Sequence, residues 1–535
     1  MTTYRICCCF WRRYKPASDE PPEAIKAVFA KYADQSGTMG VEQLRRFMVE
    51  VQGEAVESAE AAARDVLDGF RHFRRKGLSL DSFFNYLTSN ENTALYSTSL
   101  VHQDMGAPLS HYFIYTSHNS YLTGNQLNSD SSDVPIVKAL QRGVRVIELD
   151  MWPNEKNDDI SILHGRTLTT PVGLMKCLKS IREHAFAASP YPVIITLEDH
   201  LPPDLQAKAA KMIHETFGEM LFLPKSDSLR EFPSPEELKM KIIISTKPPK
   251  EYRETRSTKE REDEAQKEAE EGAWGKDVPD LDAELSAISK IDEHEASKHF
   301  HEEEEEDTEG VEQRPPQRTV APEYKSLIAI TAKKKKGGLS DALKIDPHRV
   351  TRLSLSEQVF IKATVSHGTE IVRANGGCGY VKKPDLLLNS DPDRIFDPKS
   401  TLRIKKTLKV RVYMGDGWRF DFHQRHFDQY SPPDFYTRVG IAGVPADTTM
   451  KRTRAIEDNW TPMWDEEFEF PLSVPELALL RIEVHEYDMD VKDDFGGQTC
   501  LPVWELRSGI RSVRLYDQKG ELLPSVKLLM QFEFI

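Results

Sequence analysis

The chain has 535 residues, a formal net charge of −15 at pH 7, and 29% charged against 39% hydrophobic residues. That length is ample for three or four domains with sizeable cores. No run of about 18 apolar residues occurs, which excludes a transmembrane helix. Three of the six cysteines are scattered and three are contiguous, a usage typical of a reduced cytoplasmic protein rather than of a disulfide framework.

Residues 1–19 are expected to form an N-terminal tail that contains three adjacent cysteines, Cys7, Cys8 and Cys9. Aromatic and basic side chains follow directly, so this tail could be acylated and serve as a membrane anchor. A tail without a function is an equally favoured alternative. The stretch lacks the long apolar core of a signal peptide.

Residues 20–100 are expected to form a helical lobe, because apolar residues recur at spacings of three and four in AIKAVFAKYA and EQLRRFMVEV. The pattern resembles half of an EF-hand pair. The loop that begins at Asp34 has Arg45 where an EF-hand carries its bidentate glutamate. We therefore expect this EF-hand-like lobe to pack against other parts of the protein rather than to bind calcium.

Between His111 and Asp199, several predicted strands end on polar side chains. One strand, over 112–117, runs into His118 and Asn119, and a second, over 144–149, leads to Glu148 and Asp150. His164 and Glu198 follow in the segments SILHG and VIITLED. Residues i and i+2 of a strand share a face, and the C-terminal ends of barrel strands form one site. This arrangement predicts a metal-dependent phosphoryl-transfer site.

The ligand types in this segment indicate which metal it would hold. Asn119, Glu148, Asp150 and Glu198 offer only oxygen, which suits Ca²⁺ or Mg²⁺ and argues against zinc. The two histidines then remain for acid–base chemistry or for stabilising charge on phosphorus.

The strings PLSHYFIYTSHNSYLTGNQL, RVIELDMW, ILHGRTLTT and SPYPVIITLEDH closely resemble the X region of eukaryotic phosphoinositide-specific phospholipase C. YKSLIAI, RLSLSEQ and NGGCGYVKKPDLLL resemble its Y region, and the layout resembles the plant type. The resemblance implies a multidomain α/β protein with a TIM-type catalytic barrel. The X half would cover residues 105–249 and the Y half residues 323–390.

The resemblance also implies roles for individual residues. His118 would stabilise charge on the phosphoryl group, and His164 would act as general acid. Asn119, Glu148, Asp150 and Glu198 would hold a catalytic Ca²⁺, with Glu148 or Glu198 also placed to deprotonate the inositol 2-hydroxyl. The substrate-binding residues would be Lys247 and Ser354.

The Y half departs from the family pattern. Asn375 follows Ser354 by only 21 positions, whereas the family carries two further barrel strands and an Arg-x-Tyr substrate motif between these landmarks. A strand–helix–strand unit needs about 30 residues or more, so the interval cannot hold them. We expect a shortened Y half and a barrel that it leaves incomplete.

Residues 250–322 separate the two halves and are expected to be an acidic, disordered linker. Residues 251–320 hold 24 acidic against 10 basic side chains and show almost no aliphatic periodicity. The linker could shield the site, as the resemblance implies, or serve as an inert tether. The remainder of the chain is close to neutral and could approach an anionic membrane.

Residues 400–535 are expected to form a β-sandwich, because short alternating strands such as LKVRVYM and LRIEVHEY are separated by turn signals. Acidic side chains gather in two of its loops and resemble the calcium loops of a C2 domain, where Ca²⁺ bridges to anionic lipid. The expected ligands are Asp434, Glu486, Asp488 and Asp494.

The resemblance implies a calcium-dependent enzyme that cleaves phosphatidylinositol 4,5-bisphosphate to diacylglycerol and inositol 1,4,5-trisphosphate in signalling. We expect a cytoplasmic monomer, peripherally associated with the plasma membrane, that binds a phosphoinositide substrate and an anionic membrane surface but no nucleic acid. The alternative is a catalytically impaired, calcium-dependent membrane adaptor. A metal-independent phosphodiesterase of the bacterial type is disfavoured by the carboxylate set.

Overall fold

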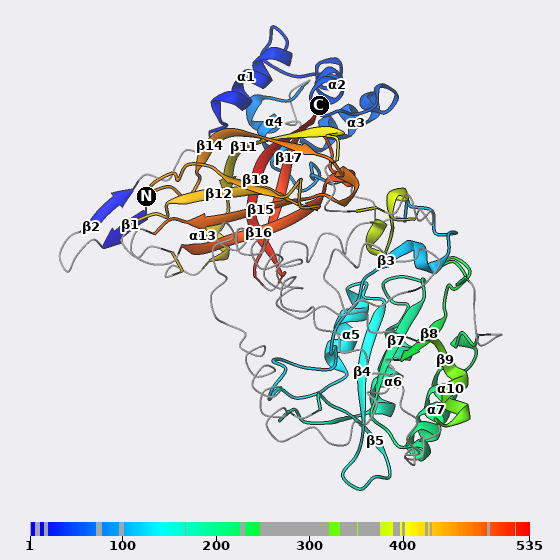
Figure 1. Ribbon diagram of the computed structural model, residues 1–535. Coiled ribbons are helices and arrows are strands. Elements are labelled where there is room, and N and C mark those ends of the chain that lie inside the picture. Colours follow the sequence, from blue (N-terminus) through cyan, green and yellow to red (C-terminus); the bar gives the residue numbers. More distant parts are fainter. Residues whose placement is uncertain are drawn as a thin grey trace, which may run out of the picture.

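The computed structural model of the protein has three parts, coloured along the chain in Figure 1. It describes residues 20–70, 77–95, 101–165, 167–224, 231–246, 320–331, 350, 375–388, 396–397, 402–422, 426–427, 431–488, 493–518 and 520–535, together with the backbone of two paired strands, β1 (Thr2–Arg5) and β2 (Trp11–Tyr14). The cysteine run Cys7–Cys9 and the acidic linker up to residue 319 lie outside these ranges. No described helix is long and apolar enough to cross a membrane.

The N-terminal lobe consists of four helices, α1 (Glu23–Tyr32), α2 (Val41–Glu50), α3 (Val56–Phe70) and α4 (Leu80–Leu87). Apolar residues spaced by three and four lie on one side of each helix and are buried, for example Phe29 and Phe47. The lobe's core continues into the C-terminal sandwich through Tyr413, Ile510 and Leu529. The packing role predicted for this lobe is therefore confirmed.

The loop after α1 has its own internal hydrogen bonds. Asp34 Oδ1 accepts from the backbone N–H groups of Ser36 and Thr38, at 2.9 and 3.1 Å. Arg45, in the position of the EF-hand glutamate, forms an ion pair with Glu42 at 2.8 Å. A cationic side chain in this position opposes calcium binding.

The middle part is an α/β unit built on parallel strands that run in the order β4 (Val146–Pro153), β7 (Val193–Asp199), β8 (Ile242–Thr246) and β9 (Ile328–Thr331). Two short antiparallel strands, β5 (Ile160–Ile162) and β6 (Val172–Gly173), extend the sheet beyond β4. Four helices pack against it: α5 (Val134–Gln141), α6 (Leu174–His184), α7 (Pro203–Phe217) and α10 (Pro322–Leu327). This layout is one side of a TIM-type barrel.

The chain at β3 (Tyr112–Ile114) joins this sheet in two steps. β3 first pairs antiparallel with β10 (Tyr380–Lys382), and Thr116 then forms a parallel bridge to Val146 of β4. The predicted strand over 112–117 is therefore shared between two partners. Among the described residues β9 pairs only with β8, and residues 332–349 and 351–374, which include Ser354, lie outside the described ranges.

The segment around β10 fills the N-terminal ends of the parallel strands. The buried Tyr380 hydroxyl donates to Pro192 O, just before β7, at 2.9 Å. Asn375 Oδ1 accepts from the backbone N–H groups of His102 and Gln103 at 3.0 and 2.9 Å. Gly379 has φ +82°, and a Cβ there would lie 2.3 Å from Gly143 O, so a side chain cannot be accommodated. Among the described residues, this segment therefore packs at the N-terminal rather than the C-terminal ends of the strands.

The C-terminal part is an antiparallel sandwich in the order β13-β12-β15-β16-β17-β18-β11-β14. Its strands are β11 (Lys406–Asp416), β12 (Phe435–Ala442), β13 (Thr449–Arg452), β14 (Met463–Leu472), β15 (Leu479–Glu486), β16 (Asp494–Pro502), β17 (Gly509–Tyr516) and β18 (Leu522–Phe534), with one short helix, α13 (Trp418–Asp421). Large aromatic side chains such as Trp418 and Trp464 fill the space between the two layers.

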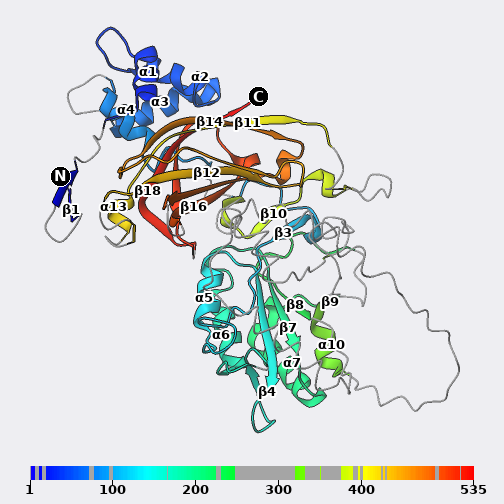
Figure 2. The ribbon, with the colours of Figure 1, turned by 60° about the vertical axis from the view of Figure 1, so that its left-hand side comes forward.

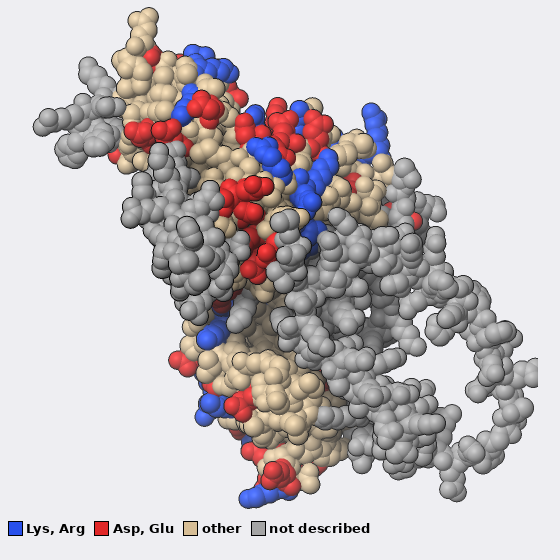
Figure 3. All heavy atoms as spheres, turned by 90° about the vertical axis from the view of Figure 1, so that its left-hand side faces the viewer, with Lys and Arg blue, Asp and Glu red and all other residues tan. Residues whose placement is uncertain are grey.

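The lobe and the sandwich lie together, and the α/β unit lies below them (Figures 1 and 2). Side-chain contacts across the junction include an ion pair of 2.5 Å between Arg142, which follows α5, and Glu521. On the face shown in Figure 3, acidic and basic side chains are interspersed over the lobe and the sandwich. β3 and β10 lie at the end of the α/β unit nearest the sandwich, and β5 lies at the far end (Figures 1 and 2).

Candidate active site

Alternation along β4 separates its core residues from its carboxylates. Ile147, Leu149 and Met151 are buried and pack against the surrounding helices. The intervening Glu148 and Asp150 therefore lie on the other face, inside the curve of the sheet. Both carboxylates are almost fully buried, at 0% and 5% exposure.

β7 adds a third carboxylate beside them. Parallel pairing of β4 and β7 places Glu198 directly opposite Asp150. Ligand oxygens of Glu148, Asp150 and Glu198 all lie within 4.8 Å of one another. The structure thus brings together three of the predicted calcium ligands.

His118 and Asn119 follow the bridge between Thr116 and β4. Ser117 fixes this turn, because its N–H and hydroxyl both donate to Val146 O, at 3.0 and 2.9 Å. Asn119 is buried and has φ +44°, a left-handed conformation that asparagine tolerates better than most residues. The exposed His118 places Nε2 3.9 Å from Glu148 Oε2.

His164 lies in the loop after β5. Its Nδ1 lies 2.7 Å from the backbone oxygen of Gln126. A carbonyl oxygen can only accept, so Nδ1 carries the proton and Nε2 is the nitrogen available for proton exchange. The hydroxyl of Thr167 donates to His164 O at 2.6 Å, and the His164 N–H donates to Thr169 Oγ1 at 3.2 Å.

Trp152 and His200, which the sequence analysis did not single out, form a chain of contacts that leads to Glu198. The rings of Trp152 and His200 stack with their centroids 3.9 Å apart. His200 Nε2 in turn lies 3.8 Å from Glu198 Oε1. The only sequence signal for His200 is its position two residues after Glu198, at the end of the same strand.

The electrostatics around Tyr121 are those of an anionic site. Burial raises the pKa of the Tyr121 hydroxyl, and the charge of Asp150 raises it further. Three carboxylates this close together repel one another unless a cation lies between them. Oxygen ligands at these separations suit Ca²⁺, so the residues present fit the predicted ion.

The remaining predicted residues divide into two groups. Lys247 and Ser354, the expected substrate contacts, lie outside the described residues.

The acidic residues of the sandwich gather at one end. Glu486 is in register with Asp494, and Tyr487 N donates to Asp434 O at 2.8 Å. Asp488 N donates to Asp493 Oδ1 at 3.1 Å, so Asp493 is a further acidic residue of this group. Within the described ranges these carboxylates do not form a cluster as compact as that of the barrel.

Comparison with known proteins gives three family matches along the chain. Residues 105–248 match the X domain of phosphatidylinositol-specific phospholipase C, residues 406–517 a C2 domain and residues 23–97 an EF-hand. Phosphoinositide phospholipase C 2 of Arabidopsis thaliana is 51% identical over 595 aligned positions, which cover 100% of this chain and 99% of the relative. The chain belongs to the phosphoinositide phospholipase C family. The plant-type resemblance is thereby confirmed.

More distant members of the phospholipase C family match as well. The human 1-phosphatidylinositol 4,5-bisphosphate phosphodiesterase delta-1 is 30% identical, over 95% of this chain and 71% of the relative. The crystal structure of PLC21 from S. officinalis superposes with a TM-score of 0.69 at 20% identity, covering 96% of this chain and 68% of the other. The predicted combination of an EF-hand-like lobe, a TIM-type barrel and a C2 sandwich is confirmed.

Proposed function

We propose that this phospholipase C cleaves phosphatidylinositol 4,5-bisphosphate to diacylglycerol and inositol 1,4,5-trisphosphate in a calcium-dependent reaction. The observation that carries the proposal is the carboxylate cluster of Glu148, Asp150 and Glu198 with His118 at its edge. These groups lie at the C-terminal ends of parallel strands, where barrel enzymes place their chemistry.

Asn119, Glu148, Asp150 and Glu198 would hold the Ca²⁺. When bound, the ion lowers the pKa of a coordinated hydroxyl and neutralises charge on the phosphoryl group. Glu148 or Glu198 accepts the proton of the inositol 2-hydroxyl, whose oxygen attacks the adjacent phosphorus. His118, exposed at the rim, stabilises the negative charge that develops on the phosphoryl oxygens.

His164 supplies the proton for the leaving group. With Nδ1 protonated toward Gln126 O, His164 acts as an imidazolium and donates its Nε2 proton to the diacylglycerol oxygen as the bond from phosphorus to that oxygen breaks. The product at this point is a cyclic inositol phosphate. Water then attacks the phosphorus and gives a proton to His164 Nε2, while the bond to the 2-oxygen breaks and the protonated Glu148 or Glu198 returns its proton to that oxygen. The hydrogen bond between Nδ1 and Gln126 O keeps the ring oriented through both steps.

We also propose that the C2 domain recruits the enzyme to an anionic membrane surface, with Asp434, Glu486, Asp488 and Asp494 as calcium ligands. The support is their position at one end of the sandwich, on neighbouring strand ends. Bound Ca²⁺ would bridge these carboxylates to lipid phosphates. We propose that the protein is a cytoplasmic monomer that associates peripherally with the plasma membrane through this contact.

A shortened Y half favours a second candidate function, a catalytically impaired membrane adaptor. The alignment with the Arabidopsis relative spans 595 positions, whereas the chain has 535 residues. At least 60 aligned positions of the relative therefore have no counterpart here. We place a gap between Ser354 and Asn375, where the family pattern is interrupted.

Product analysis tests the proposed reaction. Vesicles that contain phosphatidylinositol 4,5-bisphosphate are incubated with the protein and Ca²⁺, and the soluble products are separated by charge. Inositol trisphosphate that disappears with His164→Gln supports the proposal. Membrane binding without any soluble inositol phosphate would instead support the adaptor.

A further inference from the structure

Gln126 contacts both the candidate metal ligand and the candidate acid. Its side-chain Oε1 accepts a hydrogen bond from Asn119 Nδ2 at 2.9 Å. Its backbone oxygen lies 2.7 Å from His164 Nδ1. Gln126 belongs to the loop between Asn119 and α5 and is only partly exposed.

The bond to Asn119 determines how that amide faces the carboxylate cluster. An asparagine amide has one oxygen and one nitrogen, and only the oxygen can bind a cation. Because Nδ2 donates to Gln126, Oδ1 is left to face the ion. Exchange of the two amide atoms of Asn119 would place its Oδ1 opposite Gln126 Oε1, so that two acceptors face each other, and would turn its N–H groups toward the metal.

The loops that carry Gln126 and His164 are also joined directly. Leu168 N donates to Leu127 O at 2.8 Å, one residue beyond Gln126. Further along, the Thr170 hydroxyl donates to Asp130 Oδ1 at 2.8 Å. These two bonds attach the loop of Gln126 to the loop of His164.

We propose that Gln126 is a positioning residue that holds the calcium ligand Asn119 and the general acid His164 in one arrangement. This inference deepens the proposed function and rests on it. The side chain of Gln126 orients the metal ligand, whereas its backbone carbonyl sets the tautomer of the acid. A side-chain substitution therefore breaks the first contact and leaves the second in place.

Leucine and glutamate at position 126 separate these effects. Gln126→Leu keeps the size of the side chain and removes the acceptor, whereas Gln126→Glu keeps an oxygen that can accept from Asn119. A net hydrogen bond is worth about 1 kcal/mol, or roughly fivefold in a binding constant. We expect Gln126→Leu to raise the half-saturating Ca²⁺ concentration about fivefold and Gln126→Glu not to raise it. Gln141→Leu, an exposed site on α5, is the matched control.

Calcium binding is measured without substrate by isothermal titration of the full chain, and Asp150→Asn identifies the heat that belongs to the barrel site. This readout does not require turnover, so it distinguishes failure of the positioning role from failure of the proposed reaction. The unfolding temperature without calcium should fall by only a few degrees in Gln126→Leu, because one hydrogen bond of the buried Asn119 amide is lost while the fold is kept. In the Asn119→Ala background, Gln126→Leu should cause no further shift.

An unchanged half-saturating concentration in Gln126→Leu would overturn the inference, as would a shift of equal size in the Asn119→Ala background. If Gln126→Leu fails to fold, Gln126→Glu decides the question. A fivefold loss of affinity in that variant, which retains the acceptor, would also contradict the proposal.

Discussion

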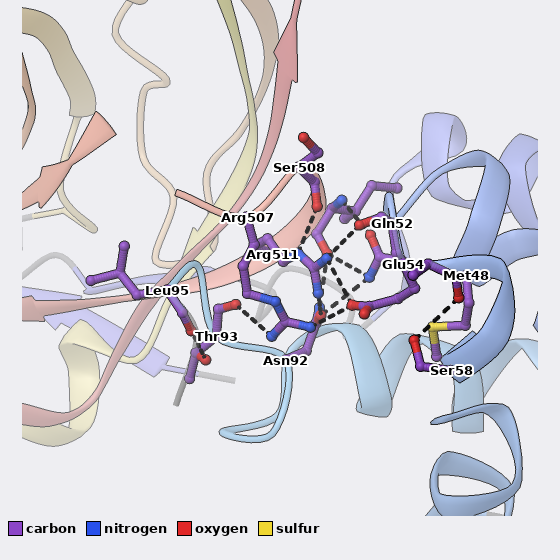
Figure 4. A network of polar contacts seen from close by, with 12 residues as sticks. Met48, Gln52, Glu54, Ser58, Asn92, Thr93, Leu95, Arg507, Ser508 and Arg511 are labelled. Carbon is purple, nitrogen blue, oxygen red and sulfur yellow. Dashed lines mark hydrogen bonds and ion pairs between the residues drawn. The ribbon is translucent and has the colours of Figure 1, made fainter. Parts of the chain in front are cut away.

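Gln52, after helix α2, pairs with the backbone of Ile510 in strand β17 as a neighbouring strand would. Its Oε1 accepts from Ile510 N at 2.6 Å, and its Nε2 donates to Ile510 O at 2.9 Å. Arg511 Nη2 donates to the backbone oxygen of Gln52 at 2.7 Å (Figure 4). These bonds attach the EF-hand-like lobe to the C2 sheet, and all three residues are buried.

Substitution of Gln52 tests whether this attachment stabilises the protein. Gln52→Leu leaves the buried Ile510 N–H without its acceptor, which costs about 1–3 kcal/mol. We expect a loss of that size in the free energy of unfolding, measured in urea. Gln43→Leu on α2, a partly exposed site, is the control and should change stability by less than about 0.5 kcal/mol. Equal effects of the two substitutions would contradict the role of Gln52.

Asp150 tests the calcium site without catalysis. A ligand present at 100 times its dissociation constant stabilises the folded state by about 2.7 kcal/mol. Calcium should therefore raise the unfolding temperature of the wild type, and a chelator should reverse the rise. Asp150→Asn should lose part of that rise, whereas Asp204→Asn, at an exposed position in the first turn of α7, should retain all of it. An undiminished rise in Asp150→Asn would rule Asp150 out as a ligand.

Glu483 of the C2 sandwich should make stability depend on acid pH. Burial raises the pKa of Glu483. The hydrogen bond with His485 and the charges of Arg481 and Arg438 lower it by more than burial raises it, so the pKa falls to about 2. The unfolded value is about 4.3. The carboxylate therefore stabilises the fold above pH ~4.3, and this stability is lost as the pH falls toward 2.

The difference in unfolding free energy between wild type and Glu483→Gln should accordingly shrink between pH 5 and pH 3, by an amount on the order of 1–2 kcal/mol. Urea unfolding at several pH values measures it. Glu469→Gln removes an exposed partner of Lys409 and should show almost no such trend. A difference that stays constant with pH would show that the Glu483 ion pairs do not stabilise the folded state.

Asp488 tests the membrane role of the C2 domain. Asp488→Asn removes one of the proposed calcium ligands, and calcium-dependent sedimentation with phosphatidylserine vesicles should fall about tenfold or more, since each missing charge weakens both ion and lipid binding. Glu533→Gln, at an exposed position of β18, should bind like the wild type. Equal binding by both variants would show that the membrane contact lies elsewhere in the protein.

Much of the site follows from local sequence patterns. Glu148 and Asp150 are two apart in an apolar, β-branched run, so their shared face was predictable from strand geometry alone. The helical lobe was likewise predictable from spacings of three and four. These features depend on neighbours in the chain, where periodicity carries information.

Contacts between distant segments were not predictable in the same way. Asp150 and Glu198 lie opposite each other because of the register of two parallel strands. The hydrogen bonds between Gln52 and Ile510 join residues that are 458 positions apart in the sequence. Gln126 gave no signal of its own, because a glutamine in a polar loop is usually solvated. Such contacts are set by the fold, which brings together residues that no sequence spacing relates.

The most direct test of this account is the calcium-dependent release of water-soluble inositol phosphate from vesicles of bisphosphorylated phosphatidylinositol. His118→Ala serves as the control, since loss of one charge-stabilising group typically lowers turnover by about 100-fold or more. We predict release by the wild type that this variant abolishes, which would establish that the chain assembles a working site even with the shortened Y half that we propose. No release, alongside calcium-dependent vesicle binding, would contradict the account and leave a lipid-binding protein.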